Sequence, residues 1–256
     1  MKGWAVGAEA RLLPIRGGAM LYDSSRAGNA EPGWLEADWW RQRGTVSTAP
    51  EGRGDVKFVA ADGRELVLRH YRRGGLIAHI STDRFLWRGP FRTRSLAEWQ
   101  LLYRLRRAGL PVPVPIAAGY RRDGLTYRAD LLIERLCDVH SLAALLRAGP
   151  VPITTWIAVG RCVRRFHDQG VCHADLNAHN ILLGADEQPW LIDFDRGSLR
   201  APGWWRDANL ARLHRSLVKV SATLPAERFG TADWLSLLDG YFAGAPAVAG
   251  PATSAC

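Results

Sequence analysis

The stretch VCHADLNAHNILL, from Val171 to Leu183, constrains the possible folds of this chain more than any other. It holds His173, Asp175 and Asn180 in the spacing H-x-D-L-x-x-x-N. The later run WLIDFD places Asp193 18 residues after Asp175. Two short apolar runs separated by a turn predict a hairpin whose second strand ends in this acid. Such a hairpin brings Asn180 and Asp193 together at its open end, where their side-chain oxygens can hold a divalent metal ion.

The part of the chain before this stretch is rich in strand patterns. Alternating residues and two turn signals predict a short antiparallel meander from about Thr45 to Tyr71. Apolar residues at helical spacing predict a helix that begins at Ser95 and stops at Gly109. Two further strands are expected around 116–120 and 125–135, joined by an Asp-Gly turn. This half therefore resembles a small sheet with one helix.

Helical patterns dominate after about residue 137. Helices are expected over residues 141–149, 154–170, 204–221 and 232–242. The chain then ends in an Ala/Gly/Pro-rich segment, which we expect to be frayed. We accordingly predict a first lobe at 1–137 with a poorly defined start of about 44 residues, a second lobe at 138–243, and a flexible tail at 244–256.

The opening motif and the DFD run at Asp193 to Asp195 together resemble the catalytic loop and metal-binding motif of protein-kinase-like folds. The resemblance implies an α+β bilobal fold, with a small antiparallel-sheet N-lobe and a mainly helical C-lobe, and implies ATP and Mg²⁺ as cofactors. In that fold Asp175 would orient or deprotonate the acceptor hydroxyl. Asn180 and Asp193 would hold the metal, while His173 would brace the loop.

The first lobe should then supply the nucleotide-binding groups. GRGDVKFV resembles a glycine-rich phosphate loop, with Gly52 and Gly54 in place and Lys57 where the third glycine belongs; a plain hairpin turn is the alternative. LVLR ends at Arg69, which stands where kinases place a lysine on the α/β-phosphates. Arg69 can make the same ion pair through a planar fork, although Lys57 is a second candidate for the phosphates.

The helix after this strand offers the matching acid, Glu98. We expect Glu98 to pair with Arg69, and the alternative is a capping box with Ser95, because S-x-x-E is the signature of that cap. Glu134 and Leu136, at the end of the last strand, complete the predicted nucleotide site.

Three features argue against a protein kinase. Asn177 replaces the loop lysine of peptide kinases, no A-P-E follows, and only about ten residues separate Asp195 from the helix near Trp204. A peptide-docking activation segment does not fit in that interval. We therefore expect the acceptor to be a hydroxyl of a small molecule or a glycolipid.

A wider pattern is similar to the 3-deoxy-D-manno-octulosonic acid (Kdo) kinase family. It consists of the segments VLRHYRRGGL, GLPVPVPIAAGY, HADLNAHNILL, WLIDFDRG and NLARLHRSLVK. The resemblance implies ATP-dependent phosphorylation of the 4-hydroxyl of Kdo on the lipid A precursor, during synthesis of the lipopolysaccharide inner core. It also implies a cytoplasmic enzyme, peripheral on the inner face of the bacterial inner membrane.

The charge of the chain agrees with such an acceptor. The formal net charge is +9, and nearly all of the positive charge comes from arginine. A basic surface selects anionic partners, here the lipid A phosphates, the Kdo carboxylate and an anionic membrane surface. Arg72, Arg73, Arg196 and Arg200 are candidate acceptor or membrane contacts, with ordinary solvated arginines as the alternative. No nucleic-acid partner is expected, because no recognition motif accompanies the charge.

The helix expected over 204–221 carries an apolar stripe that suits either a membrane surface or, as we favour, the core of the second lobe. No stretch approaches the length of a transmembrane helix, and the first residues lack the apolar run of a secretory signal. Two other functions remain open: a kinase-like aminoglycoside or sugar phosphotransferase, and a nucleotide-binding scaffold without catalysis.

Overall fold

The computed structural model describes residues 9–49, 56–72 and 83–243. Gly52, Gly54, Arg73 and the predicted flexible tail lie outside the described residues. The chain forms two compact units. Unit 1 contains the chain up to Arg104 and the segment Val114–Arg135, and unit 2 contains Leu105–Pro113 and the chain from Leu136 onward. The predicted α+β class, with a sheet-rich first part and a helix-rich second part, is confirmed.

Unit 1 is built on an antiparallel sheet in the order β1-β2-β7-β8-β5-β4-β3, with β6 paired to β8. The strands are β1 (Ala10–Ile15), β2 (Gly18–Asp23), β3 (Gly44–Thr48), β4 (Val56–Ala61), β5 (Arg64–His70), β6 (Phe85–Leu86), β7 (Pro115–Asp123) and β8 (Thr126–Glu134). The predicted meander is thus confirmed as β3, β4 and β5, and the two later strands as β7 and β8.

The start of the chain, which the sequence left undefined, contributes two strands and three short helical segments to unit 1. These segments are α1 (Ser24–Ala27), η1 (Pro32–Leu35) and α2 (Ala37–Arg41). Trp34 and Trp40 are buried there, and the indole N–H of Trp40 donates to the Trp34 carbonyl at 2.8 Å. They pack with Leu66, Leu68 and other buried side chains of the sheet, so the region is part of the core of unit 1.

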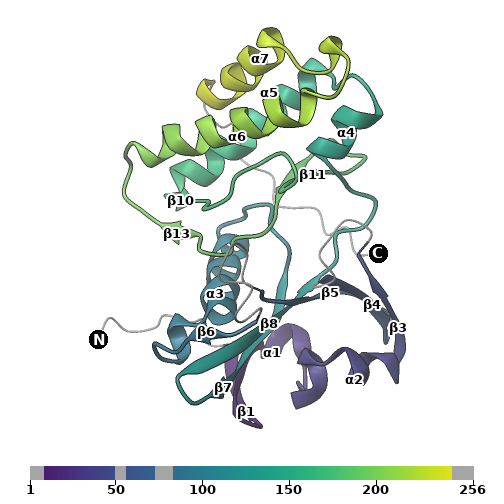
Figure 1. Ribbon diagram of the computed structural model, residues 1–256, viewed down its shortest axis with the longest axis vertical. Coiled ribbons are helices and arrows are strands. Elements are labelled where there is room, and N and C mark those ends of the chain that lie inside the picture. The colour runs from purple at the N-terminus through teal and green to yellow at the C-terminus, as the bar shows by residue number, and fades with distance from the viewer. Residues whose placement is uncertain (1–8, 50–55, 73–82, 244–256) are drawn as a thin grey trace. The chain divides into compact units, whose positions relative to one another are not determined.

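The predicted helix of unit 1 is α3 (Arg94–Arg107), preceded by the short turn η3 (Pro90–Arg92). Its residues Leu96, Trp99 and Leu102 are buried, as their helical spacing requires. Gly109 follows with a φ of 72°, a left-handed conformation that ends the helix at low cost only for glycine. Figure 1 shows α3 on one side of the sheet and α1 and α2 on the other.

Unit 2 is mainly helical. Its helices are α4 (Leu142–Ala148), α5 (Ile153–Asp168), α6 (Trp205–Ser221), η4 (Ala226–Arg228) and α7 (Thr231–Phe242). Its short strands are β9 (His140–Ser141), β10 (Val171–Cys172), β11 (Ile181–Leu183), β12 (Pro189–Leu191) and β13 (Ser198–Leu199). Strand β11 pairs with β12 and β9, and β10 pairs with β13. All four predicted helices of this part and the predicted β11–β12 hairpin are confirmed.

Helices α5 and α7 form the closest helix contact in unit 2. A Cβ atom on Gly160 of α5 would collide with the Leu237 carbonyl of α7, and one on Gly240 would collide with the Ile157 carbonyl. The two glycines therefore let the helix backbones touch. Trp156 and Phe166 of α5 are fully buried, which stabilises unit 2 by roughly 2–3 kcal/mol each.

Helix α6 turns its apolar stripe into unit 2. Leu210, Leu213 and Leu217 are buried, so the favoured core-packed interpretation of this helix is confirmed. In the described parts of the chain, no helix combines the length and the apolar character that crossing a membrane requires.

Candidate active site

The loop between β10 and β11 is held in shape by His173. The buried imidazole accepts the Asp175 backbone N–H at Nδ1 (3.1 Å), so its Nε2 donates to the Ile192 carbonyl (2.9 Å). Acceptance at Nδ1 needs a neutral ring, and burial lowers the pKa of His173 from its ordinary value. Asn209 of α6 adds two bonds to the His173 backbone, one to its N–H and one to its carbonyl. His173 thus braces the loop, as its place in the motif led us to expect.

Asn177 folds the middle of the same loop. Its Oδ1 accepts the backbone N–H groups of His179 (2.8 Å) and Asn180 (3.2 Å), and its Nδ2 donates to the Asp175 carbonyl (3.0 Å). An asparagine side chain that bonds to backbone two residues on is a turn former. The residue that replaces the kinase lysine therefore shapes the loop.

Asp175 is exposed on this loop and meets a cation from another element. Its Oδ1 accepts from Nη1 of Arg212 on α6 at 3.0 Å, and the two side chains are 56% and 48% exposed. A carboxylate in this setting is reachable by a substrate hydroxyl. Arg212 thus places a positive charge beside Asp175, in a loop that lacks the lysine.

Asn180 and the chain next to Asp193 are joined directly. The Ile192 N–H donates to the Asn180 carbonyl at 3.1 Å, next to the β11–β12 pairing, and this bond fixes the two motif segments against each other. Asp193 has a φ of 60°, a left-handed conformation that is uncommon for residues other than glycine. Backbone strain of this kind persists where the surroundings enforce it and is concentrated at functional sites.

The donor set of Asn180 and Asp193 suits a hard divalent cation. Asn180 is nearly buried, and its Nδ2 donates to the Asp175 carbonyl (2.9 Å), so its Oδ1 is left as the acceptor. Amide and carboxylate oxygens are the ligands that Mg²⁺ prefers, usually with phosphate oxygens and water completing the shell. The described residues contain no group of three or more His, Cys, Asp or Glu side chains arranged for a metal. A site made of Asn180, Asp193 and phosphate oxygens does not require such a group, because only two of its ligands come from the protein.

In unit 1, Arg69 of β5 pairs with Glu98 of α3. The guanidinium makes two contacts with the carboxylate, at 2.9 and 3.4 Å, and the Tyr71 hydroxyl donates to the same carboxylate. The Glu98 side chain is only 2% exposed, while that of Arg69 is 20% exposed. The predicted ion pair is confirmed. The alternative capping box does not fit the start of the helix: α3 begins at Arg94, so Ser95 lies within its first turn, and its hydroxyl donates to the Gly119 carbonyl.

The strand register bears on the second phosphate candidate, Lys57. Lys57 of β4 faces Leu68 across the ladder, while Val56 faces Arg69. Directly paired residues share a face of a sheet and successive residues alternate, so Lys57 and Arg69 lie on opposite faces. Arg69 projects from the face of the sheet on which it pairs with Glu98, and Lys57 projects from the other face. This favours Arg69 over Lys57 as the phosphate-binding cation.

The remaining predicted residues lie at element ends. Glu134 is the last residue of β8, and Leu136 follows it at the boundary of the two units. Arg72 is exposed directly after β5. Arg196 is exposed in the turn after the DFD run, with a φ of 59°, and Arg200 bonds Ser198 through its Nε. Their roles stay predictions.

A family model described as lipopolysaccharide kinase (Kdo/WaaP) family matches residues 37–241. The chain belongs to this family. A 3-deoxy-D-manno-octulosonic acid kinase of Xylella fastidiosa (strain M12) is 51% identical over 206 residues, which cover 80% of this chain and 82% of the relative. The kinase of the same name from Xanthomonas campestris pv. campestris (strain B100) is 50% identical over 206 residues, 79% of this chain and 81% of the relative. That of Stenotrophomonas maltophilia (strain K279a) is 48% identical over 223 residues, 84% of this chain and 88% of the relative.

In each unit of this Kdo/WaaP family member, one partner of a predicted site residue escapes prediction from the sequence. Arg212 is one of several arginines on α6, and no local pattern distinguishes it from the others. Tyr71 is expected only as the end of a strand. Both meet their acids through tertiary contacts 37 and 27 residues apart, which periodicity and short motifs do not encode.

Proposed function

We propose that this member of the lipopolysaccharide kinase family transfers the γ-phosphoryl group of ATP to the 4-hydroxyl of Kdo on the lipid A precursor. The family match and the three named relatives support the kinase class and the Kdo acceptor. One observation carries the proposal. Asp175 stands exposed on a loop braced by His173, and that loop is fixed through the Asn180–Ile192 bond to the segment bearing Asp193.

Asp175 would bind the acceptor hydroxyl through its carboxylate. The proton of that hydroxyl moves to Asp175 as the acceptor oxygen forms its bond to the γ-phosphorus and the bond from that phosphorus to the leaving ADP oxygen breaks. Arg212 holds the carboxylate from one side at 3.0 Å and leaves its other edge for the hydroxyl.

Asn180 and Asp193 would hold Mg²⁺ through their side-chain oxygens. When bound, the ion would neutralise charge on the phosphate oxygens of ATP. Arg69 would contact the α/β-phosphates, held in place by Glu98 and Tyr71. Lys57, Gly52 and Gly54 stay predicted nucleotide contacts, as do Glu134 and Leu136.

We further propose that the enzyme works as a peripheral protein on the cytoplasmic face of the inner membrane, where its acceptor is anchored. Arg72, Arg73 and Arg196 are proposed to meet the acceptor's anionic groups. Arginine suits these groups because its fork matches phosphate and carboxylate geometry.

The test is mass spectrometry of the Kdo-bearing lipid A precursor after incubation with the full chain, ATP and Mg²⁺. We expect the mass of one added phosphate, and fragmentation should place it on the 4-hydroxyl. Aminoglycosides and free sugars are supplied in parallel reactions. Phosphorylation of a soluble acceptor in preference to the precursor would overturn the Kdo assignment, and no ATP turnover with any acceptor would favour a non-catalytic role.

A further inference from the structure

Two turns of unit 1 lie side by side at one end of its sheet. The Arg122 N–H, at the end of β7, donates to the Gly17 carbonyl in the β1–β2 turn at 2.8 Å. Strand β6 adds a third segment, because Leu86 pairs with Thr126 at the start of β8. This end of the sheet is therefore a composite surface of three chain segments.

The surface carries two exposed leucines. Leu125, in the β7–β8 turn, is 77% exposed, and Leu86 is 55% exposed. They are close neighbours, because the N–H of Trp87 donates to the Leu125 carbonyl at 2.9 Å. A single exposed leucine needs no explanation. Two on adjacent segments, Leu86 in β6 and Leu125 in the β7–β8 turn beside a partly buried tryptophan, make up the apolar point of this end of the sheet.

A basic cavity of about 590 Å³ adjoins this point. Its lining contains Arg16, Arg84, Arg121, Arg122 and Arg128, but only two acids, Glu36 and Asp123. Thr126, which pairs with Leu86, lines the same cavity. The apolar point and the arginines thus belong to one surface.

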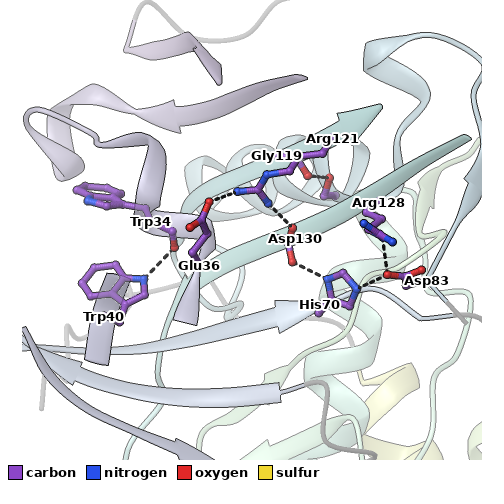
Figure 2. A network of polar contacts seen from close by, with 10 residues as sticks. Trp34, Glu36, Trp40, His70, Asp83, Gly119, Arg121, Arg128 and Asp130 are labelled. Carbon is purple, nitrogen blue, oxygen red and sulfur yellow. Dashed lines mark hydrogen bonds and ion pairs between the residues drawn. The ribbon is translucent and has the colours of Figure 1, made fainter. Parts of the chain in front are cut away.

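Three of these arginines are neutralised by nearby acids. Arg121 contacts Glu36 at 2.7 Å and Asp130 at 3.5 Å, and Arg128 contacts Asp83 at 2.7 Å, as Figure 2 shows. Arg84 pairs with Asp123. The charges of these three arginines are therefore balanced by carboxylates within unit 1.

Arg122 and Arg16 differ from these three arginines because neither forms an ion pair among the described residues. Arg122 donates to the Gly124 carbonyl and lies over the Trp87 ring, 5.0 Å from its centroid, and no carboxylate of the residues that the structure describes pairs with it. Arg16 is exposed, and no hydrogen bond or ion pair is found for its side chain among the described residues. Two guanidinium charges are therefore left for an external anion.

We propose that this tip, defined as Arg16, Leu86, Arg122 and Leu125, docks the enzyme on an anionic phospholipid bilayer. The guanidinium groups meet lipid phosphates, and the leucines enter the interfacial layer. Exposed leucines beside arginines fit a bilayer better than nucleic acid, which selects stacking aromatic groups. The apolar point is also much smaller than a stable protein interface. The inference rests on the proposed function only in that the acceptor is anchored in a membrane.

The test is flotation of the full chain with vesicles, without ATP or acceptor. We compare vesicles of phosphatidylcholine alone with vesicles that also contain phosphatidylglycerol. The variants are Arg16→Ala with Arg122→Ala, and Leu86→Ser with Leu125→Ser. The matched control is Leu199→Ser with Trp204→Ser, which removes comparably exposed apolar groups from unit 2. Thermal melts verify that each variant is folded.

We expect wild type to bind the mixed vesicles, with binding that weakens as salt is raised. The arginine pair should lower the binding constant about 25-fold, since each arginine near an anionic surface contributes about fivefold. The leucine pair should lower it about tenfold, and the control should bind like wild type. Equal binding to both vesicle types, no vesicle binding, loss in the control alone, or preference for DNA over vesicles would overturn the inference.

A second readout separates this inference from the proposed function. Both tip variants should phosphorylate detergent-dispersed acceptor at the wild-type rate and lose rate only on acceptor embedded in anionic vesicles. If wild type phosphorylates no acceptor but its tip-dependent vesicle binding persists, the proposed function fails and the docking surface stands. An equal loss of rate in detergent would assign the tip to the active site and overturn the docking role.

Discussion

The Arg69–Glu98 pair of unit 1 and the Arg212–Asp175 pair of unit 2 differ in burial and in the number of partners around the acid. Glu98 is almost fully buried and receives Arg69 and the Tyr71 hydroxyl. Asp175 is more than half exposed and receives a single contact from Arg212, itself half exposed. The first acid has its hydrogen-bonding capacity filled by the protein, while the second keeps part of it for another molecule.

The difference follows from what each acid is proposed to do. A buried carboxylate is costly unless it is fully bonded, so Glu98 serves as a fixed anchor that orients Arg69. An exposed pair contributes little to stability, because water screens it and its side chains are mobile. Asp175 can therefore exchange part of its contact with Arg212 for a substrate hydroxyl at small cost.

The largest effect is expected from Asp175→Asn. This substitution removes the proton acceptor and should lower kcat by about 10²- to 10⁴-fold. The free energy of unfolding should change by less than about 1 kcal/mol, because the Arg212 pair is exposed. Steady-state kinetics and urea unfolding measure the two quantities. Asp186→Asn, at the exposed β11–β12 turn, is the matched control and should behave like wild type; wild-type kcat in Asp175→Asn would contradict the assignment of the base.

The second-largest effect is expected from Glu98→Ala, which tests the contribution of the buried Arg69–Glu98 pair. Removing one partner of a buried pair takes the carboxylate away from Arg69 and should lower the free energy of unfolding by about 3–5 kcal/mol. The KM for ATP should also rise, since Arg69 loses its orientation. The control is Glu65→Ala on the same sheet: its pair with Arg135 is about one-third exposed and should contribute less than about 1 kcal/mol. Equal losses in both variants would show that burial does not distinguish the two pairs.

A third pair, buried but uncharged, separates the effect of burial from that of charge. His167 bonds the Tyr241 hydroxyl at 2.8 Å, and burial lowers the pKa of His167 to about 4. The unfolded chain binds this proton near the ordinary histidine pKa of 6.5, whereas the folded chain excludes it until about pH 4. The free energy of unfolding should therefore fall as pH drops from 6.5 to 4, by at most about 3 kcal/mol.

Urea unfolding across this pH range measures the slope. His167→Gln keeps a hydrogen-bonding group but does not titrate, so the part of the slope due to His167 should vanish. Ala185→Ser, in the exposed β11–β12 turn, removes no titrating group and should retain the wild-type slope. A slope unchanged in His167→Gln would refute the assignment to this residue.

The smallest effect on stability is expected from Arg212→Ala. Breaking the exposed pair should change the free energy of unfolding by less than about 1 kcal/mol. The kcat should fall about tenfold, which corresponds to about 1.4 kcal/mol of lost positioning. Arg212→Lys should restore much of the rate, because lysine returns a positive charge beside the Asp175 carboxylate. Arg215→Ala on the same helix is the control. If Arg212→Ala lost as much stability as Glu98→Ala, exposure would not distinguish the two pairs.

The elements that carry long, regular patterns are the ones that can be predicted from the sequence. Helices α3 and α5 show apolar residues at helical spacing, and their predicted stripes are buried. The β11–β12 hairpin follows from two apolar runs around a turn, and the Arg69–Glu98 pair from its place in the kinase-like pattern. In each case the deciding signal is local or belongs to a known motif.

The start of the chain is not predictable in the same way. Pro14 and Gly17 interrupt the pattern of strands β1 and β2, and helices α1 and α2 are too short to show a period. Burial of Trp34 and Trp40 depends on the sheet they pack against, which forms from residues far along the chain. Asn177 stands out in the sequence only because it replaces a lysine. Its three loop hydrogen bonds show that it also determines the backbone path.

The glycine contact between α5 and α7 has a consequence for synthesis on the ribosome. Every strand of the unit 1 sheet has been translated once residue 134 emerges, so that sheet can complete its pairing early. The partner surface of Gly160 contains Gly240, which is translated 80 residues later. Unit 2 should therefore remain incomplete until α7 has been translated, and ribosome-bound chains that end before α7 should be protease-sensitive from α5 onward while the unit 1 sheet is already protected.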